Sequence, residues 1–222
     1  MFVEYVRCCG REFCFSGRRN PIILDMTITG SYSNSFSSPR SSFLGSSVWS
    51  VVDPVYPIDG PSNWHVSGGK LRQDSDIRGS SSAYGSMLIY NSKVWGNASA
   101  SITTTSSDDG EVGLILRYRD RDNYYRFSVD RRLRVAKIVE VQDGHAKLLF
   151  KTTSSAVTSG NALTLQFWIK ENWLMAGLDG TWHFVLSDGS GDPNYLGRAG
   201  VYTRAHRASF DNFSVTPLTP EM

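Results

Sequence analysis

Arginine is the residue type in this sequence with the clearest capacity to bind a charged ligand. Seventeen of the 23 basic residues are Arg, and seven of those fall within residues 117–134. Arg117, Arg119 and Arg121 alternate, so a continuous strand would point all three toward one face. Because a guanidinium fork binds carboxylate or sulfate through two parallel hydrogen bonds, that face suits an anionic polysaccharide. The alternative is a solvated face, neutralised by nearby carboxylates at Asp120, Asp122 and Asp130.

Aromatic residues form a second set suited to ligand binding. The chain has 6 Trp, 10 Tyr and 11 Phe, and sugar sites combine aromatic faces with a few planar polar groups. Trp95 and Trp168 are predicted to be exposed, Trp168 because Leu165, Phe167 and Ile169 fill the core side of its strand. These two tryptophans are therefore the predicted aromatic sugar contacts. The alternative for each is core packing, in which a ring buries a large apolar area.

Oxygen-bearing side chains recur at alternate positions in the glycine-rich stretch DGSGDPN, residues 188–194. Calcium binds about six to eight oxygen ligands. Asp188, Asp192 and Asn194 are therefore predicted calcium ligands. Two features favour an ordinary turn instead: Pro193 stands where helix-flanked calcium loops place a glycine, and no Glu follows at the twelfth position.

The sequence offers little for catalysis. Glycoside hydrolysis requires two carboxylates about 5–10 Å apart in a cleft, and no closely spaced acidic strand motif is evident. There is no helical His-Glu pair and no serine-centred elbow. His183 and Asp188 are the only conceivable acid–base residues. The four histidines are scattered over separate segments: His65, His145, His183 and His206.

The elements that must position these residues are β-strands. Beyond Val48, short apolar runs are separated by turn signals about every 8–12 residues, and no segment keeps a helical period. The clearest alternation places Leu163, Leu165, Phe167 and Ile169 on the inward face of one strand. The predicted strands are 47–52, 69–74, 86–91, 98–105, 110–119, 123–130, 133–141, 145–151, 162–170, 172–178, 181–187, 198–204 and 207–216.

Tight turns predict that neighbouring strands are antiparallel. Asp143-Gly144, Glu171-Asn172 and Asp179-Gly180 suit the positive φ angles of two-residue hairpins, and residues 119–122 form a fourth turn. About thirteen strands exceed the roughly ten that a single open sheet usually holds. We therefore expect an all-β fold, a two-sheet antiparallel jelly-roll sandwich.

Composition fits one globular domain with a separate leader. The 222 residues have a net charge of +2, which argues against a dedicated nucleic-acid binder, and no apolar run is long enough to span a membrane. All three cysteines lie in the first 14 residues, so the main body is not a disulfide scaffold. We expect a poorly ordered leader and linker over 1–46, a domain over 47–217 and a tail over 218–222. The serine-rich end of the linker is expected to be extended or to lie over the domain as an edge segment.

Three blocks of the sequence resemble the concanavalin A-like lectin/glucanase superfamily. They are GPSNWHVSGGKLRQDSDI at 60–77, EVGLILRYRDRDNYYRFSVD at 111–130 and GRAGVYTRAHRASFDNFSV at 197–215. The blocks are most similar to those of the thrombospondin C-terminal-like and laminin-G-like branch, and they occur in the same order. The resemblance covers residues 48–216, and in related jelly rolls the Asp of the final strand holds a structural calcium. It therefore implies Asp211 as a calcium ligand, with Asp53 as its partner. The E-x-D-x-x-E motif of the laminarinase-like relatives is missing.

These observations predict a non-catalytic module, stabilised by calcium, that binds carbohydrate or an extracellular partner protein. The resemblance implies an extracellular or cell-surface location and leaves an oligomer open. One alternative is an assembly protein that uses its sheets for protein contacts. A third reading, an unfamiliar carbohydrate-active hydrolase or lyase, stays open.

Overall fold

The computed structural model describes residues 6–8, 11–13, 30–37, 47–80, 84–106, 108–158, 160–187 and 196–218, and all of its regular elements there are β-strands. None of these residues forms a helix, so none forms an apolar helix long enough to cross a membrane. The strands are β1 (Val6–Cys8), β2 (Arg11–Phe13), β3 (Tyr32–Asn34), β4 (Trp49–Val52), β5 (Trp64–Ser67), β6 (Lys70–Gln73), β7 (Ser86–Trp95), β8 (Ala98–Thr105), β9 (Glu111–Asp120), β10 (Asn123–Asp130), β11 (Val135–Gln142), β12 (His145–Thr153), β13 (Leu163–Lys170), β14 (Trp173–Leu178), β15 (Thr181–Ser187), β16 (Gly197–Arg204) and β17 (Ala208–Pro217).

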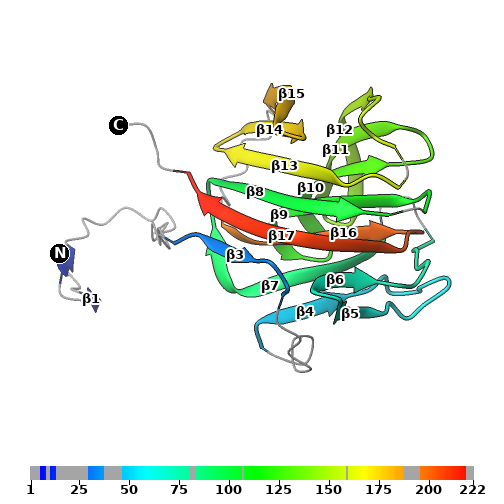
Figure 1. Cartoon of the computed structure of the whole chain (residues 1–222). Coiled ribbons are helices and arrows are strands. Elements are labelled where there is room, and N and C mark those ends of the chain that lie inside the picture. Colours follow the sequence, from blue (N-terminus) through cyan, green and yellow to red (C-terminus); the bar gives the residue numbers. More distant parts are fainter. Residues whose placement is uncertain are drawn as a thin grey trace.

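Two antiparallel sheets form a sandwich, as the sequence predicted (Figure 1). The seven-stranded sheet has the order β12-β11-β10-β9-β16-β7-β4, and the eight-stranded sheet has the order β15-β14-β13-β8-β17-β6-β5, with β3 added on β17. A separate two-stranded sheet joins β1 and β2. The final strand β17 is central, paired with β8, β6 and β3.

The core lies between the two sheets and follows the period of two that strands impose. Leu163, Leu165, Phe167 and Ile169 are all buried, which confirms the inward face predicted for β13. Phe127 of β10 meets Phe167 across the sandwich, with ring centroids 6.0 Å apart.

The predicted hairpins are confirmed by the backbone. Asp143-Gly144 and Asp179-Gly180 have positive φ at both residues, and Glu171 has φ of 54°. These turns join β11 to β12, β14 to β15 and β13 to β14 in antiparallel pairs. Since two-residue hairpins with positive φ match the twist of the flanking strands, these pairings follow directly from local sequence.

Part of the segment expected as a linker belongs to the sandwich. Tyr32–Asn34 pairs with β17 in the eight-stranded sheet, as Figure 1 shows for β3. Tyr32 stacks on Tyr90 with ring centroids 3.9 Å apart, and Phe36 is buried in the core. The edge-segment alternative is therefore the one observed for these residues.

The outer face of the seven-stranded sheet carries a second buried apolar cluster, which includes Met87, Ile89, Ile115 and Tyr202. Two loops meet beside this face, one after β4 and one before β7, and an isolated bridge between Ile58 and Arg78 joins them. A strand that is buried on both faces has a continuous run of apolar residues. Because β9 is buried on both faces, its sequence contains the run VGLIL.

Candidate functional site

A pocket of about 230 Å³ lies where the two loops meet the β9–β10 turn. The loop after β4 forms one wall, the loop before β7 forms another, and Met87 of β7 adjoins them from the sheet. The turn contributes Arg121 and Asp122, and the remaining lining residues are Asp53, Pro54, Val55, Tyr56, Gly79, Ser80, Tyr84 and Gly85.

Asp53 is fixed at the pocket by a chain of hydrogen bonds that begins in the core. The buried indole of Trp64 donates through Nε1 to Ser86 Oγ at 2.7 Å, and Ser86 donates to Asp53 Oδ1 at 2.7 Å. Asp53 Oδ2 accepts the backbone N–H of Ser62 at 3.1 Å. Trp64 of β5 thus orients this carboxylate through Ser86.

Tyr84 and Asp122 are held together against the β11–β12 turn. The Tyr84 hydroxyl donates to the Gly144 carbonyl at 2.6 Å, and the Gly144 N–H donates to the Asp122 carbonyl at 3.0 Å. A Cβ on Gly144 would come within 3.2 Å of the Tyr84 hydroxyl and 3.4 Å of Asp122 Oδ1. Burial and the negative charge of Asp122 raise the pKa of Tyr84, so its hydroxyl stays a donor at neutral pH.

The prediction that Arg117, Arg119 and Arg121 share one face is wrong. Arg117 has φ of 51° and occupies a bulge in β9, where the register with β16 shifts by one residue. A bulge reverses the alternation beyond it. The Arg117 side chain is buried and donates to the carbonyls of Glu171 at 2.6 Å and Gly96 at 3.3 Å.

The other two arginines differ from Arg117 and from each other. Arg119 is exposed at the end of β9 and does not line the pocket. Arg121 lies in the β9–β10 turn and does line it. Of the three predicted ligand contacts, the structure therefore places one at the pocket.

The two predicted aromatic contacts also separate. Trp95 is only 3% exposed and packs in the core beside Tyr90, so its predicted exposure is wrong. β7 continues four residues beyond its predicted end, and its register with β16 shifts between Tyr90 and Trp95, so both side chains face the core although they are five residues apart. Trp168 is half-buried on the outer face of the eight-stranded sheet, as its strand alternation predicted.

The predicted calcium ligands are distributed over the fold. Asp53 lies at the pocket, whereas Asp211 lies on β17 with its Oδ1 accepting the N–H of Asn212 at 2.7 Å. Because neighbouring Phe210 points into the core, Asp211 faces outward from the eight-stranded sheet. Asp188, Asp192 and Asn194 lie outside the described residues. The side chain of His183, which was paired with Asp188 as an acid–base candidate, lies outside them too.

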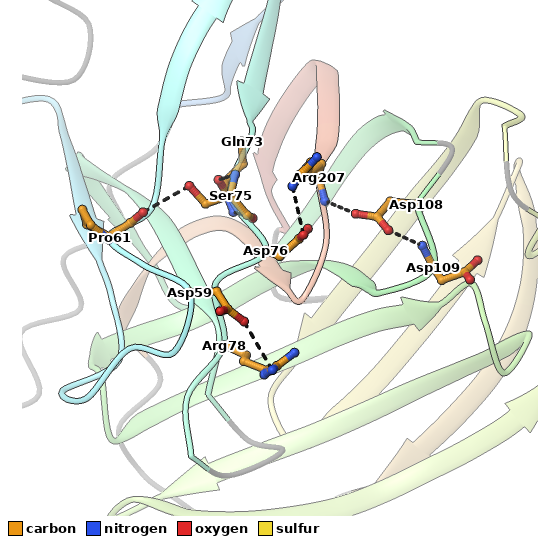
Figure 2. Close-up of polar contacts among 9 residues, drawn as sticks. All are labelled: Asp59, Pro61, Gln73, Ser75, Asp76, Arg78, Asp108, Asp109 and Arg207. Atoms are coloured by element: carbon orange, nitrogen blue, oxygen red, sulfur yellow. Dashed lines mark hydrogen bonds and ion pairs between the residues drawn. The ribbon is translucent and has the colours of Figure 1, made fainter.

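A further acidic group lies beside the turn between β16 and β17. Figure 2 shows Asp76 and Asp108 on either side of Arg207. Arg207 Nη2 lies 3.1 Å from Asp76 Oδ2, and the Arg207 N–H donates to Asp108 Oδ2 at 2.9 Å. Asp108 Oδ1 also accepts the N–H of Asp109, and backbone donors lower the pKa of Asp108 despite its partial burial. These carboxylates thus have a cation and backbone partners from the chain itself.

No set of three or more His, Cys, Asp or Glu side chains within the described ranges is close enough to hold a metal ion. The side chains of Tyr56 and Asp122 were not singled out as ligand contacts from sequence. Asp120 orders the β9–β10 turn, since its Oδ1 accepts the N–H of Asp122 at 2.8 Å. Tyr56 is 80% exposed at the pocket.

No protein-family model matches the sequence, and no curated protein matches it. Solved structures do match in fold. A carbohydrate-binding module, CBM66 from Bacillus subtilis, is 17% identical with a TM-score of 0.63, over 76% of this chain and 95% of that one. The fold is an all-β, two-sheet antiparallel jelly-roll sandwich. A Bacillus subtilis protein of unknown function with a galectin-like fold is 12% identical with a TM-score of 0.62, over 86% of this chain and 96% of that one.

A third match covers part of a longer chain. The GH43 protein BlXynB of Bacillus licheniformis, as its K247S mutant, is 19% identical with a TM-score of 0.59, over 84% of this chain but 39% of that one. At these identities the matches establish the jelly-roll architecture. The thrombospondin and laminin-G branch stays a prediction.

Proposed function

We propose that this domain is a non-catalytic carbohydrate-binding module whose pocket takes one neutral sugar unit at the end of a glycan. The observation that carries the proposal is the convergence of Asp53, Tyr84, Arg121 and Asp122 on one pocket of about 230 Å³. Pockets for drug-sized ligands are typically about 300–1,000 Å³, so this one suits a single ring. The carbohydrate-binding module and the galectin-like protein of similar fold support the same class of function.

The polar groups match the chemistry of a sugar. Sugar hydroxyls donate and accept hydrogen bonds, and charged partners make the stronger bonds. Asp53 and Asp122 supply fixed acceptors, while the Arg121 guanidinium supplies paired donors. The rings of Tyr84 and exposed Tyr56 offer the apolar faces on which C–H groups of a sugar ring pack.

Charge at the pocket favours a neutral sugar over an anionic one. Two carboxylates and one guanidinium line it, and a sulfate or uronate would face Asp53 and Asp122 as well as Arg121. Arg117 is buried and Arg119 lies outside the pocket. Of the three arginines expected to bind an anionic glycan, Arg121 is therefore the one whose guanidinium is available in the pocket. The screen should therefore include sulfated and uronate glycans, which we expect to bind more weakly than neutral sugars.

A binding role also accounts for Asp53 better than hydrolysis does. Both of its oxygens already accept hydrogen bonds from Ser62 and Ser86, which suits a fixed acceptor. The similar GH43 protein is an enzyme in which the matched part is 39% of the chain. A location outside the cell or at its surface and a protein partner are further parts of the proposal, and they rest on the family resemblance.

Screening of a glycan array followed by calorimetry tests the pocket. We expect binding to a neutral terminal sugar, with affinity reduced at least tenfold, or by about 1.4 kcal/mol, in Arg121→Ala and in Asp122→Asn. Each change removes a charge-assisted hydrogen bond, which typically contributes about 1.5–3 kcal/mol.

Two matched controls lie next to the pocket residues. Arg119→Ala removes an exposed arginine from the same hairpin, and Asp143→Asn removes a carboxylate from the adjacent turn, where Asn tolerates the φ of 48°. Both should bind like wild type. If Arg121→Ala and Asp122→Asn also retain full affinity for every array hit, the pocket is not the sugar site.

Calcium stabilisation remains a proposal for residues 188–194 and for Asp211. A bound ion raises the melting temperature by mass action because it binds only the folded state. We expect the melting temperature of wild type to rise with millimolar calcium and fall with chelator, and to rise less in Asp188→Asn/Asp192→Asn, which keeps Asp211. An unchanged melting temperature in wild type with calcium and with chelator would mean that neither site is real.

A further inference from the structure

The outer face of the eight-stranded sheet carries three tryptophans on adjacent strands. Trp168 of β13 is half-buried, while Trp173 of β14 and Trp182 of β15 are 48% and 42% exposed. Figure 1 shows these three strands side by side at the upper end of the sheet. The pocket lies instead against the outer face of the other sheet, beside Met87. The two features are therefore on opposite sides of the sandwich.

Strand register sets the spacing of the indoles. Trp168 is opposite Met175, Trp173 is opposite Lys170, and Trp182 is opposite Gly177. With standard strand spacing and rise, the Cα atoms of Trp173 and Trp168 are roughly 8 Å apart, and those of Trp168 and Trp182 roughly 12 Å apart. Trp173 and Trp182 lie on opposite sides of Trp168 along the strand direction, with their Cα atoms roughly 14 Å apart, so the three positions form a triangle on this face.

The Trp182 side chain lies close to the sheet because its cross-strand neighbour, Gly177, has no side chain. A Cβ on Gly177 would meet Trp182 Cε3 at 3.2 Å and Gln166 Oε1 at 3.3 Å. The indole therefore occupies the space above residue 177, beside the Gln166 amide, while much of it stays exposed. Gln166 Oε1 is held in place by the N–H of Gly180 at 3.0 Å.

Hydroxyl groups of β8 and β13 lie beside the tryptophans on this face. Ser99 of β8 is opposite Trp168, Ser101 is opposite Gln166, and Thr103 is opposite Thr164. The hydroxyls of Thr103 and Thr164 are 3.3 Å apart. Among the residues of β13 and β14 on this face, Lys170 is the one charged side chain.

We propose that Trp168, Trp173 and Trp182 form a second glycan-binding surface, which holds the side of an extended, uncharged polysaccharide chain. Each sugar ring of such a chain presents an apolar C–H face and a rim of hydroxyls. Indole faces pack on the first, and Gln166 with the serine and threonine hydroxyls bonds to the second.

The composition of the face distinguishes a glycan from a protein partner. The buried centre of a protein interface is more apolar than its rim, whereas on the outward faces of β13 and β14 Met175 is the one apolar side chain beside the indoles, and Thr164, Gln166 and Lys170 flank them. A nearly uncharged surface also complements an uncharged chain and gives no steering toward a polyanion. This proposal does not depend on the pocket, because a chain end and a chain side engage different sheets.

Binding to neutral polymers tests the surface. Hydroxyethyl cellulose, xylan and galactomannan are used in affinity gel electrophoresis, and insoluble cellulose and chitin in depletion assays. We expect wild type to bind at least one polymer, and Trp173→Ala/Trp182→Ala to bind it at least tenfold more weakly. Since both side chains are exposed, the melting temperature of the variant should stay close to that of wild type.

Controls separate this surface from the pocket. Arg121→Ala should keep polymer binding, and Leu148→Ala removes a 54% exposed apolar side chain from β12 without touching either site. The proposal is overturned if wild type binds none of the polymers, or if the double tryptophan variant binds as wild type does. It is also overturned if polymer binding follows Arg121 instead, or if wild type forms a dimer that the double variant abolishes while no polymer binds.

Discussion

Glu111→Gln lowers the free energy of unfolding by about 3–5 kcal/mol, the cost of leaving a buried charge without its partner. Glu111 begins β9 and is almost fully buried on the outer side of the seven-stranded sheet. Its Oε1 lies 3.2 Å from Arg126 Nη2, and its Oε2 lies 2.8 Å from Lys137 Nζ. Ser128 also donates to Oε1, at 2.6 Å.

The cost arises mainly at Arg126. Its side chain is 2% exposed, so it cannot recover hydration when the carboxylate is removed, whereas Lys137 is nearer the surface. Burial opposes the charge on Glu111, but Arg126 and Lys137 outweigh it and lower the Glu111 pKa. The Arg126 guanidinium lies 4.1 Å from the ring centroid of Tyr202, and Tyr202 is paired with Met87 at the pocket. The loss therefore reaches the candidate site.

Urea denaturation measures this effect, with Glu140→Gln as the matched control. Glu140 is also buried, but its cation partner Lys147 is 63% exposed and can return to water, so the cost should be clearly smaller. Glu111→Leu/Arg126→Met removes both charges and should recover much of the loss. A Glu111→Gln protein within 1 kcal/mol of wild type would contradict the role of the ion pair.

The second large effect is a fall in stability in mild acid because of His206. This residue is 0% exposed in the turn between β16 and β17, and neither ring nitrogen has a hydrogen-bond partner among the described residues. Burial lowers the pKa of His206 from 6.5 to about 4. The Asp108 charge raises it, Arg131 lowers it and Glu111 raises it, by smaller amounts.

The direction of the effect follows from proton uptake. Below pH 6.5 the unfolded chain binds a proton at His206, but the folded chain does so only near pH 4. Stability is therefore fully present above pH 6.5 and falls between there and pH 4, by about 3 kcal/mol. Glu111, whose folded-state pKa is lowered from 4.5, adds its own loss of stability from about pH 4.5 downward.

Unfolding free energies between pH 4 and pH 7.5 test this prediction. His206→Leu should abolish most of the slope between pH 6.5 and pH 4.5, while His145→Leu, at an exposed site, should keep it. A wild-type stability that is constant over this range would refute the prediction. The turn matters for the pocket because Ala205 donates to the Ile77 carbonyl and Arg207 holds Asp76 (Figure 2), on the segment that leads to Gly79.

Local sequence was sufficient for most of the strands and turns. The span predicted for the strand at 162–170 is observed as Leu163–Lys170, and the Asp-Gly pairs lie in hairpins with positive φ. These features depend on alternation and on backbone preferences within a few residues. The central place of the Phe210–Val215 stretch in the sheet also agrees with the fold expected from the resemblance.

The face on which a side chain lies could not be predicted from local sequence where it depends on a one-residue shift in strand register. The bulge at Arg117 reverses the face of every side chain beyond it, and no local residue type marks it. Trp95 was expected to be exposed, but the register shift between Tyr90 and Trp95 in β7 places its indole in the core. In both cases a shift of a few residues decides between core and surface.

The all-β sandwich, its antiparallel hairpins and the inward face of β13 could be predicted from local sequence, because they follow from a period of two and from turn residues. The pocket shared by Asp53, Tyr84 and Arg121 could not be predicted in this way. They come from three segments far apart in the chain, and they meet because β4, β7, β16 and β9 are neighbours in one sheet. Such long-range pairing is set by the packing of the whole core, and no local pattern encodes it.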